Sequence, residues 1–332
     1  SRQLCLPFAA LGIEKEGNGL FFWIRALWMA LKTGFLRTDY PELLILECAE
    51  GESRRFLSLA RPQITIVTPL SEKSRTDTGR ILTSIPSNGY AVVNNDDEEA
   101  TAIALTTRAR AITFGFKEGA DLTISNLLYR TEKTGGGYKP IGISFAVRYG
   151  NQSTLVAMDN AFGKSAAYAA GAAMCVGTAF GLHLTRTGEA LRYLELPKNS
   201  MCLSIGKKGT YILNDTAAST TEAIQNALEA VLEMPAKRVI GVFGTLHSKE
   251  GIEHDGELLN RLAIKACDAI LTVGDSPITV DSKKKIRFDN GEAAAAELQV
   301  IIERDDLVLV TGLGLEAVID ALEPISKRAP IV

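Results

Sequence analysis

The tripeptide Gly163-Lys164-Ser165 has the residue types that could hold a phosphate group. It follows an apolar run and opens an alanine-rich stretch typical of a helix. Backbone N–H groups and the Lys164 ammonium could therefore meet an anion at the helix start. A complete phosphate-binding loop also has a glycine five residues before Gly163, and this chain has Met158 there. The pattern predicts a phosphate contact through Lys164 and Ser165 without the full loop.

Three carboxylates follow apolar runs and are candidates for ligand or metal binding. Glu47 ends the run Leu43–Leu46, and Asp96 and Asp97 come shortly after Tyr90–Val93. Ligands in open α/β sheets bind at the carboxyl ends of the strands, and carboxylate oxygens are suitable ligands for magnesium. Asp96 and Asp97 are therefore candidate cofactor contacts, and Glu47 is a candidate because it follows a predicted strand. A solvated glutamate and two turn-forming aspartates are the structural alternatives.

The elements around these residues predict an α/β protein with a largely parallel sheet, because short apolar runs alternate with helical patterns. In the first part of the chain we expect buried strands at 43–46, 64–67 and 90–93, and helices at 52–60 and 164–180. Alternating residues from 111 to 157 predict an antiparallel insertion, with Gly135-Gly136-Gly137 at a loop tip.

The second part of the chain repeats a strand–helix pattern and predicts a Rossmann-like domain. Apolar runs indicate strands at 211–213, 239–243, 269–273 and 307–310. Helical patterns cover 220–233, 256–266, 292–303 and 315–322. We therefore predict two domains, residues 1–197 and 198–332.

Composition excludes several classes of function. A net charge of −3 argues against nucleic-acid binding, which needs a basic surface. The five cysteines form no CxxC pair and the three histidines have no metal-ligand spacing, so we expect buried thiols in a reducing cytoplasm. No secretory signal and no apolar run of about 20 residues, the length that spans a bilayer, is visible.

The segment Leu20–Leu31 contains Trp23 and Trp28 and is followed by basic residues. Such a segment could lie as an interfacial helix on an anionic membrane, which would place the protein at the inner membrane face. It is apolar nearly all round, so a helix buried in this protein or against a partner subunit is the preferred alternative.

Four segments, taken in order, are similar to Mur ligases of the type that adds D-Ala-D-Ala to a UDP-MurNAc peptide, the MurF type. The segments are Tyr40–Thr68, Ile85–Glu98, Met234–Asp275 and Arg304–Gly314. The resemblance covers nearly the whole chain but begins after the family's phosphate-binding loop, part-way into its central domain. It implies a central domain with a mostly parallel sheet and an antiparallel insertion, then a Rossmann-like C-terminal domain. It also implies amide formation driven by ATP and magnesium, through an acyl phosphate.

Most positions that would carry this chemistry are altered. The family helix beginning Gly-x-His-Asn-x-x-Asn has Ser165, Ala166 and Ala169 at its polar positions, and alanine offers no hydrogen bond. Thr78 stands nearest the position of the family's magnesium-binding lysine, and Thr311-Gly312-Leu313 replaces Lys-Gly-Ser. Glu47 stands where the resemblance implies a magnesium-binding glutamate, so it is the candidate metal ligand, and Asp215 persists as well. Lys164 and Ser165 remain the candidate nucleotide contacts.

Three hypotheses follow. The preferred one is a degenerate homologue that does not catalyse and acts as a binding or scaffold protein with a cell-envelope synthesis partner. The second is a fragment of an active ligase that would use ATP and magnesium, with its N-terminal part cut away or supplied by another chain. The third is a different enzyme using Lys164, His247 or Lys249.

Overall fold

The structure, a computed structural model, describes residues 42–48, 51–67, 75–246, 252–280 and 285–324. The chain divides into two compact units, Ser1–Thr113 and Phe114–Val332. The predicted domain boundary near residue 197 is a different division and stays a prediction. The segment Leu20–Leu31 and the residues His247 and Lys249 lie outside the described part of the chain.

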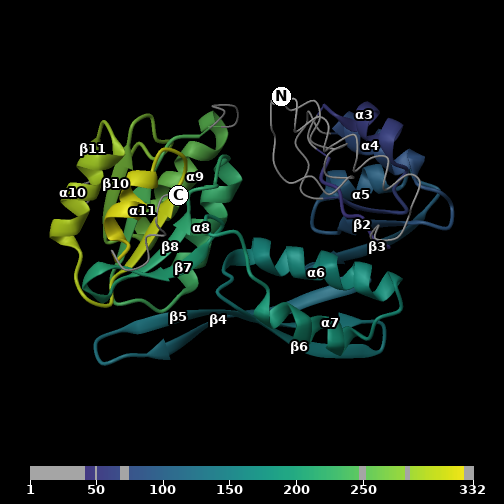
Figure 1. Cartoon of the computed structure of the whole chain (residues 1–332), viewed down its shortest axis with the longest axis horizontal. Helices are drawn as coiled ribbons and strands as arrows, with labels where there is room; N and C mark the ends of the chain where they lie inside the picture. The colour runs from purple at the N-terminus through teal and green to yellow at the C-terminus, as the bar shows by residue number, and fades with distance from the viewer. Residues whose placement is uncertain (1–41, 49–50, 68–74, 247–251, 281–284, 325–332) are drawn as a thin grey trace, which may run out of the picture. The chain divides into compact units, whose positions relative to one another are not determined.

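In the described part of the chain, the first sheet has six strands in the order β1-β2-β3-β4-β5-β6 (Figure 1). Its strands are β1 (Ile64–Val67), β2 (Tyr90–Asn94), β3 (Arg110–Gly115), β4 (Leu122–Lys133), β5 (Tyr138–Tyr149) and β6 (Gln152–Asp159). β1 pairs with β2 in parallel and β3 pairs with β4 in parallel, whereas β4, β5 and β6 are antiparallel to their neighbours. The predicted antiparallel insertion is therefore confirmed for β4–β6, but β3, which we had included in it, is a parallel strand.

Among its described residues, the first unit also contains three short helices, α3 (Ser53–Leu59), α4 (Arg75–Ser84) and α5 (Glu98–Ala104). Leu82 of α4 and Ala100 of α5 pack with Val93 of β2 in a small buried core. The turn before β2 is closed by the Gly89 N–H, which donates to the Pro86 carbonyl over 2.8 Å. These contacts fix the end of β2 from which Asp96 and Asp97 follow.

The predicted strand at 43–46 is wrong. This segment is irregular, and its apolar side chains are exposed, with Ile45 85% accessible. A strand is stable only when a neighbour satisfies its backbone hydrogen bonds. Among the described residues, β1 is the outermost strand of the sheet and pairs with β2 alone. An apolar run cannot form a buried strand where the described sheet supplies it with no partner.

Two helices cover one face of the antiparallel strands, as Figure 1 shows. They are α6 (Gly163–Ala179) and α7 (Leu184–Ala190), followed by the short helix η2 (Leu191–Tyr193). α6 approaches the sheet closely because it has glycine at position 171. A Cβ there would lie 2.9 Å from the Ile124 side chain. The small residues of α6 thus serve its packing against the sheet.

The second sheet has the order β11-β10-β9-β12-β8-β7 and is parallel except for β7. Its strands are β7 (Cys202–Ile205), β8 (Tyr211–Asp215), β9 (Val239–Phe243), β10 (Ala269–Val273), β11 (Lys285–Phe288) and β12 (Leu307–Thr311), with the short helix η3 (Lys207–Gly209). Helices α8 (Thr221–Glu233) and α9 (Ile252–Ala266) cover one face, and α10 (Gly291–Ile301) and α11 (Glu316–Leu322) cover the other (Figure 1).

The α/β prediction, with a mostly parallel first sheet and a Rossmann-like second one, is confirmed. The centre of the second sheet is its most buried part, because all five residues of both β9 and β12 are buried. No helix among the described residues is long and apolar enough to cross a membrane.

Candidate functional site

The start of α6 carries the tripeptide that was predicted to contact phosphate. Gly163 has φ +83°, a conformation that favours glycine. Phe162 precedes the helix as its N-cap without a side-chain hydrogen bond and is buried. The helix start is therefore held by packing of Phe162 in the core of the second sheet.

Lys164 is engaged with α8. Its Nζ lies 3.3 Å from Glu229 Oε2, and the Gln225 side chain donates to the other oxygen of Glu229 over 2.8 Å. Both charged side chains are partly exposed, so this ion pair adds little to stability. The ion pair does, however, direct the Lys164 ammonium toward Glu229 of the same chain.

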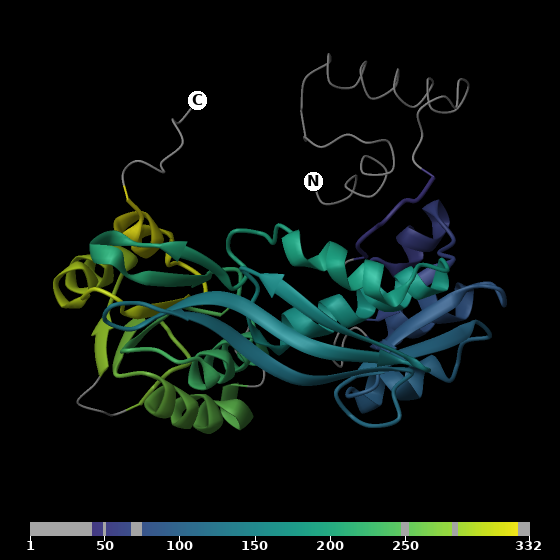
Figure 2. The ribbon, with the colours of Figure 1, turned by 90° about the horizontal axis from the view of Figure 1, so that it is seen from below.

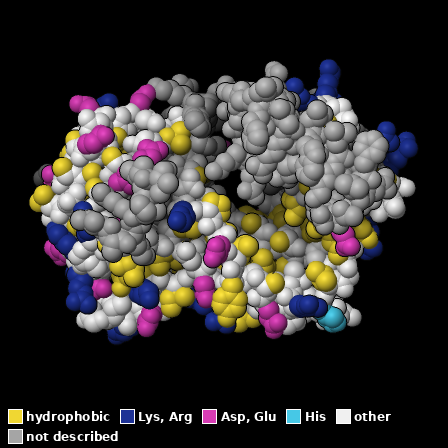
Figure 3. Space-filling view, viewed as in Figure 1, with side chains coloured by type: hydrophobic (Ala, Val, Ile, Leu, Met, Phe, Trp, Pro, Cys, Tyr) yellow, Lys and Arg dark blue, Asp and Glu magenta, His cyan; other side chains and the backbone are white. Residues whose placement is uncertain are grey.

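The outward side of α6 is largely apolar. Ser165 is exposed, and so are Ala169 and Ala173 further along the helix. Figure 3 shows apolar side chains gathered on this face, over α6 and α7. A polar ligand at this surface would find the Ser165 hydroxyl but no hydrogen-bonding group at positions 166 and 169.

Asp96 and Asp97 serve the turn between β2 and α5. The Asp97 carboxylate accepts hydrogen bonds from the backbone N–H groups of Glu99 and Ala100, both over 3.0 Å, and so caps α5. The Asp96 N–H donates to the Asn94 side chain over 2.9 Å. This is the helix-capping chemistry expected of aspartate. It gives the Asp97 carboxylate a structural role at the end of β2, where the Asp96 backbone takes part in the same turn.

Glu47 is exposed and lies in the irregular segment before α3. Among the described residues, no group of three or more histidine, cysteine, aspartate or glutamate side chains could hold a metal ion. Glu47, Asp96 and Asp97 belong to the first unit, and Lys164 and Ser165 belong to the second.

A polar network near Glu47 escaped the sequence analysis. Asp77 of α4 accepts hydrogen bonds from the Ser53 hydroxyl, from the Gly51 N–H and from Arg80. The hydrogen bond from Ser53 is the largest cause that holds the pKa of Asp77 below its usual value, and Arg80 adds to it. Arg80 also donates to Ser53 over 2.7 Å. Asp77 therefore has its charge compensated by this chain and ties α3 to α4.

Asp215 lies at the carboxyl end of β8, buried, beside the end of β12. It accepts a hydrogen bond from the Thr311 hydroxyl over 2.9 Å and another from the Met201 N–H. Burial raises the pKa of Asp215 to about 7, although both hydrogen bonds oppose the shift. The nearby thiol of Cys202 has a raised pKa too, chiefly through its own burial. Sequence reasoning named Asp215 but could not foresee its bond to Thr311, 96 residues away.

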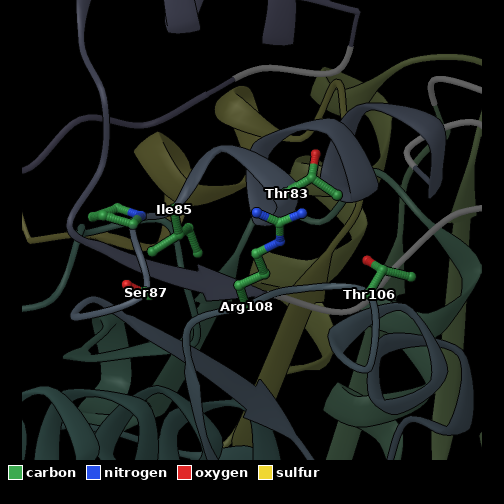
Figure 4. Close-up of a pocket in the computed structure, with 6 residues that line it drawn as sticks. Thr83, Ile85, Ser87, Thr106 and Arg108 are labelled. Atoms are coloured by element: carbon green, nitrogen blue, oxygen red, sulfur yellow. The ribbon is translucent and has the colours of Figure 1, made fainter.

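In the first unit, a hollow of about 550 Å³ opens near the start of β2, at the end away from Asp96 and Asp97 (Figure 4). Thr83, Ser87, Thr106 and Arg108 line it, together with Ile85 and Pro86. The Thr83 and Thr106 hydroxyls donate to the carbonyls of Arg80 and Ile103. Since these two hydroxyl protons are already used, an anion in the hollow would have the exposed Ser87 and Arg108 side chains as its donors. We therefore do not assign a ligand-binding site to this hollow.

Comparison with known proteins finds similarity to Mur ligases. The family of the Mur ligase glutamate ligase domain matches residues 203–314. A UDP-N-acetylmuramoyl-L-alanyl-D-glutamate–2,6-diaminopimelate ligase of Geobacillus thermodenitrificans (strain NG80-2) is 25% identical over 246 residues. That match covers 68% of this chain and 47% of the relative. A MurF ligase of Thermotoga maritima, solved in complex with ADP, has a TM-score of 0.69 at 18% identity. It is matched over 96% of this chain and 75% of its own.

This chain is therefore similar to Mur ligases in sequence and in fold.

Both sheets of this Mur ligase homologue correspond to the central and C-terminal domains of the family. A MurF of Acinetobacter baumannii has the same fold, with a TM-score of 0.66 and 17% identity over 82% of this chain and 61% of its own. The chain spans about half the length of the curated relatives that it matches, 47% in each of the first two. The relatives therefore contain a large part that has no counterpart in this match.

Proposed function

We propose that this chain is a catalytically degenerate, MurF-like homologue that acts as a binding or scaffold protein in peptidoglycan precursor synthesis. The assignment to peptidoglycan precursor synthesis is supported by the matched relatives, which are Mur ligases. The state of the α6 start carries the proposal of degeneracy. Ala166 and Ala169 offer no polar group, and Lys164 is paired with Glu229.

The residues present do not fit magnesium-ATP. Thr311 stands where the family resemblance implies a lysine, and it is buried and bonded to Asp215. A neutral hydroxyl cannot stabilise phosphate charge as an ammonium does. Glu47 is exposed, and the carboxylate of Asp77 in the same unit is already compensated by Arg80 and Ser53.

The size of the expected loss supports the same proposal. Removing one electrostatic group from an active site typically lowers the rate by about 100–1,000-fold. Several losses need not add, but the changes at 166, 169 and 311 affect separate elements of the chain, namely α6 and the end of β12. We therefore expect ligation to fall below detection.

A ligation assay tests the proposal. ATP-dependent phosphate release is measured with a UDP-MurNAc tripeptide and D-Ala-D-Ala, with a MurF ligase as the positive control. We expect release at the background rate, and capture from the native cell should recover a peptidoglycan-synthesis protein on the same chain. Turnover above background, or capture of chaperones alone, would contradict the proposal.

The alternative is an active fragment, which the coverage of 47% of the relatives' length favours. In that case the missing part would supply the phosphate-binding loop, and this chain would bind ATP and magnesium together with it. Adding the N-terminal half of a MurF ligase as a separate polypeptide discriminates the two. Restored phosphate release would favour the alternative, and no release would favour the scaffold.

A further inference from the structure

The hairpin formed by β4 and β5 ends in a glycine-rich tip that contacts the second sheet. The tip, Thr134–Gly137, joins two strands of 12 residues each. Both Figure 1 and Figure 2 show these strands continuing together toward the second sheet. The Thr134 hydroxyl donates to Asp305 Oδ1 over 3.2 Å across 171 residues of sequence. A hairpin of the first sheet is thus bonded to the turn before β12.

Asp305, the residue that accepts this hydrogen bond, is held in place by its own contacts. It is buried at 6% exposure and has φ +66°, a conformation that is uncommon for residues other than glycine. Its Oδ1 also accepts from the Tyr211 hydroxyl over 3.4 Å, and its N–H donates to the Gly209 carbonyl over 3.2 Å. One carboxylate therefore links the hairpin tip to β8.

The glycines are required by the close approach. A Cβ on Gly136 would lie 2.6 Å from Asp305 Oδ2, and a Cβ on Gly137 would lie 3.0 Å from Asp305 Cβ and 3.3 Å from Lys237 Cβ. A Cβ on Gly135 would meet nothing within 4 Å. None of the three has a positive φ, so their value lies in small size rather than backbone freedom.

We propose that Thr134–Gly137 is a strap that fastens the antiparallel arm of the first sheet to the second sheet, so that residues 114–332 move as one body. Other contacts between the same parts agree with this. Tyr129 of β4 and Phe162 pack in the core of the second sheet. The Leu203 N–H donates to the Asn160 side chain over 2.6 Å, at a point distant in sequence from the strap. The inference does not depend on the proposed function.

The glycines provide a matched pair of variants. In Gly136→Ala the new methyl group clashes with Asp305, whereas in Gly135→Ala it points into open space. Hydrogen–deuterium exchange of the full chain then reports on the strap amides and on the Leu203 amide. We expect Gly136→Ala to raise exchange at the strap by about tenfold and to raise it measurably at Leu203. We expect Gly135→Ala to match the parent.

A second pair protects the test against a failure to fold. Thr134→Val removes the hydroxyl that donates to Asp305 and accepts from the Gly137 N–H, and Thr134→Ser keeps it. The valine variant should reproduce the increase and the serine variant should not. The strap would be refuted by equal exchange in each pair. Faster exchange confined to the tip, with Leu203 unchanged, or a uniform rise throughout β7–β12 would refute it as well.

Discussion

Replacing Arg238 by methionine will destabilise the second sheet by about 3–5 kcal/mol, because it leaves a buried carboxylate without its counter-charge. Asp306 is inaccessible, and Arg238 Nε donates to its Oδ1 over 3.0 Å. The hydrogen bond with Asp306 is the main reason that the pKa of Arg238 is raised. Arg238 also donates to the Ile301 carbonyl over 2.6 Å. Its loss therefore frees two acceptors beside β12.

Urea denaturation measures this effect, and the neighbouring Lys237 supplies the control. Lys237 Nζ lies 3.5 Å from Glu303 in a pair whose side chains are 41% and 64% exposed. Lys237→Met should change stability by no more than about 1 kcal/mol. The double variant R238M/D306L should recover most of the loss, since no charge then remains buried. Equal losses of unfolding free energy in Arg238→Met and Lys237→Met would show that the burial of Asp306 does not determine the loss.

Replacing Asp215 by asparagine will change the pH dependence of folding. Burial raises the pKa of Asp215 from 3.8 to about 7, so the folded protein keeps a proton there that the unfolded chain releases. The resulting stability is fully present below pH 3.8 and is lost as the pH rises through about 7. Asparagine does not ionise. From pH 5 to pH 8 the variant should therefore gain about 2–3 kcal/mol relative to the parent.

The measurement is urea denaturation of both proteins at several values between pH 5 and pH 8. Comparing the change with pH, rather than stability at a single pH, removes the constant cost of replacing one carboxylate oxygen by an amide. A further variant, Thr311→Val, removes the hydroxyl that favours the ionised form. Its folded-state pKa at Asp215 should be higher still, so its loss of stability should continue to a higher pH than in the parent. Parallel curves for parent and Asp215→Asn would contradict a buried, titrating Asp215.

The central strands were predictable because they are buried on both faces. β9 and β10 have the bounds that the sequence predicts, and β8 and β12 extend one or two residues further. Continuous apolar runs of this length are typical of parallel strands covered by helices on both sides. The helices between them begin and end within a few residues of expectation for the same reason.

The two edge strands of the second sheet were not predictable. β7 and β11 are the outermost strands of the second sheet, and β11 contains Lys285 and Arg287 with no buried residue. An edge strand is half polar, so it lacks the apolar pattern. The opposite error occurred at Leu43–Leu46, where the run is apolar but the described sheet has no place for it. Whether such a segment forms a strand depends on a hydrogen-bonded neighbour strand more than on its hydrophobicity.

The sequence identified the polar residues of the candidate site, but it did not predict the long-range partners of these residues. Asp97 as a helix cap follows from the sequence, because its partners are two and three residues away. The partner of Lys164 is 65 residues away on α8, and only the packing of α6 against α8 brings them together. The same applies to Asp215 with Thr311. Long-range pairs of this kind decide whether a family motif still faces a ligand.

Calorimetric titration with magnesium-ATP tests most directly whether the groups that hold the nucleotide have been lost. The account predicts no saturable heat up to about 1 mM nucleotide, and the same result for the parent and for Lys164→Met. Saturable binding by the parent that Lys164→Met weakens would contradict it. That result would mean that the α6 start still receives phosphate despite its ion pair with Glu229.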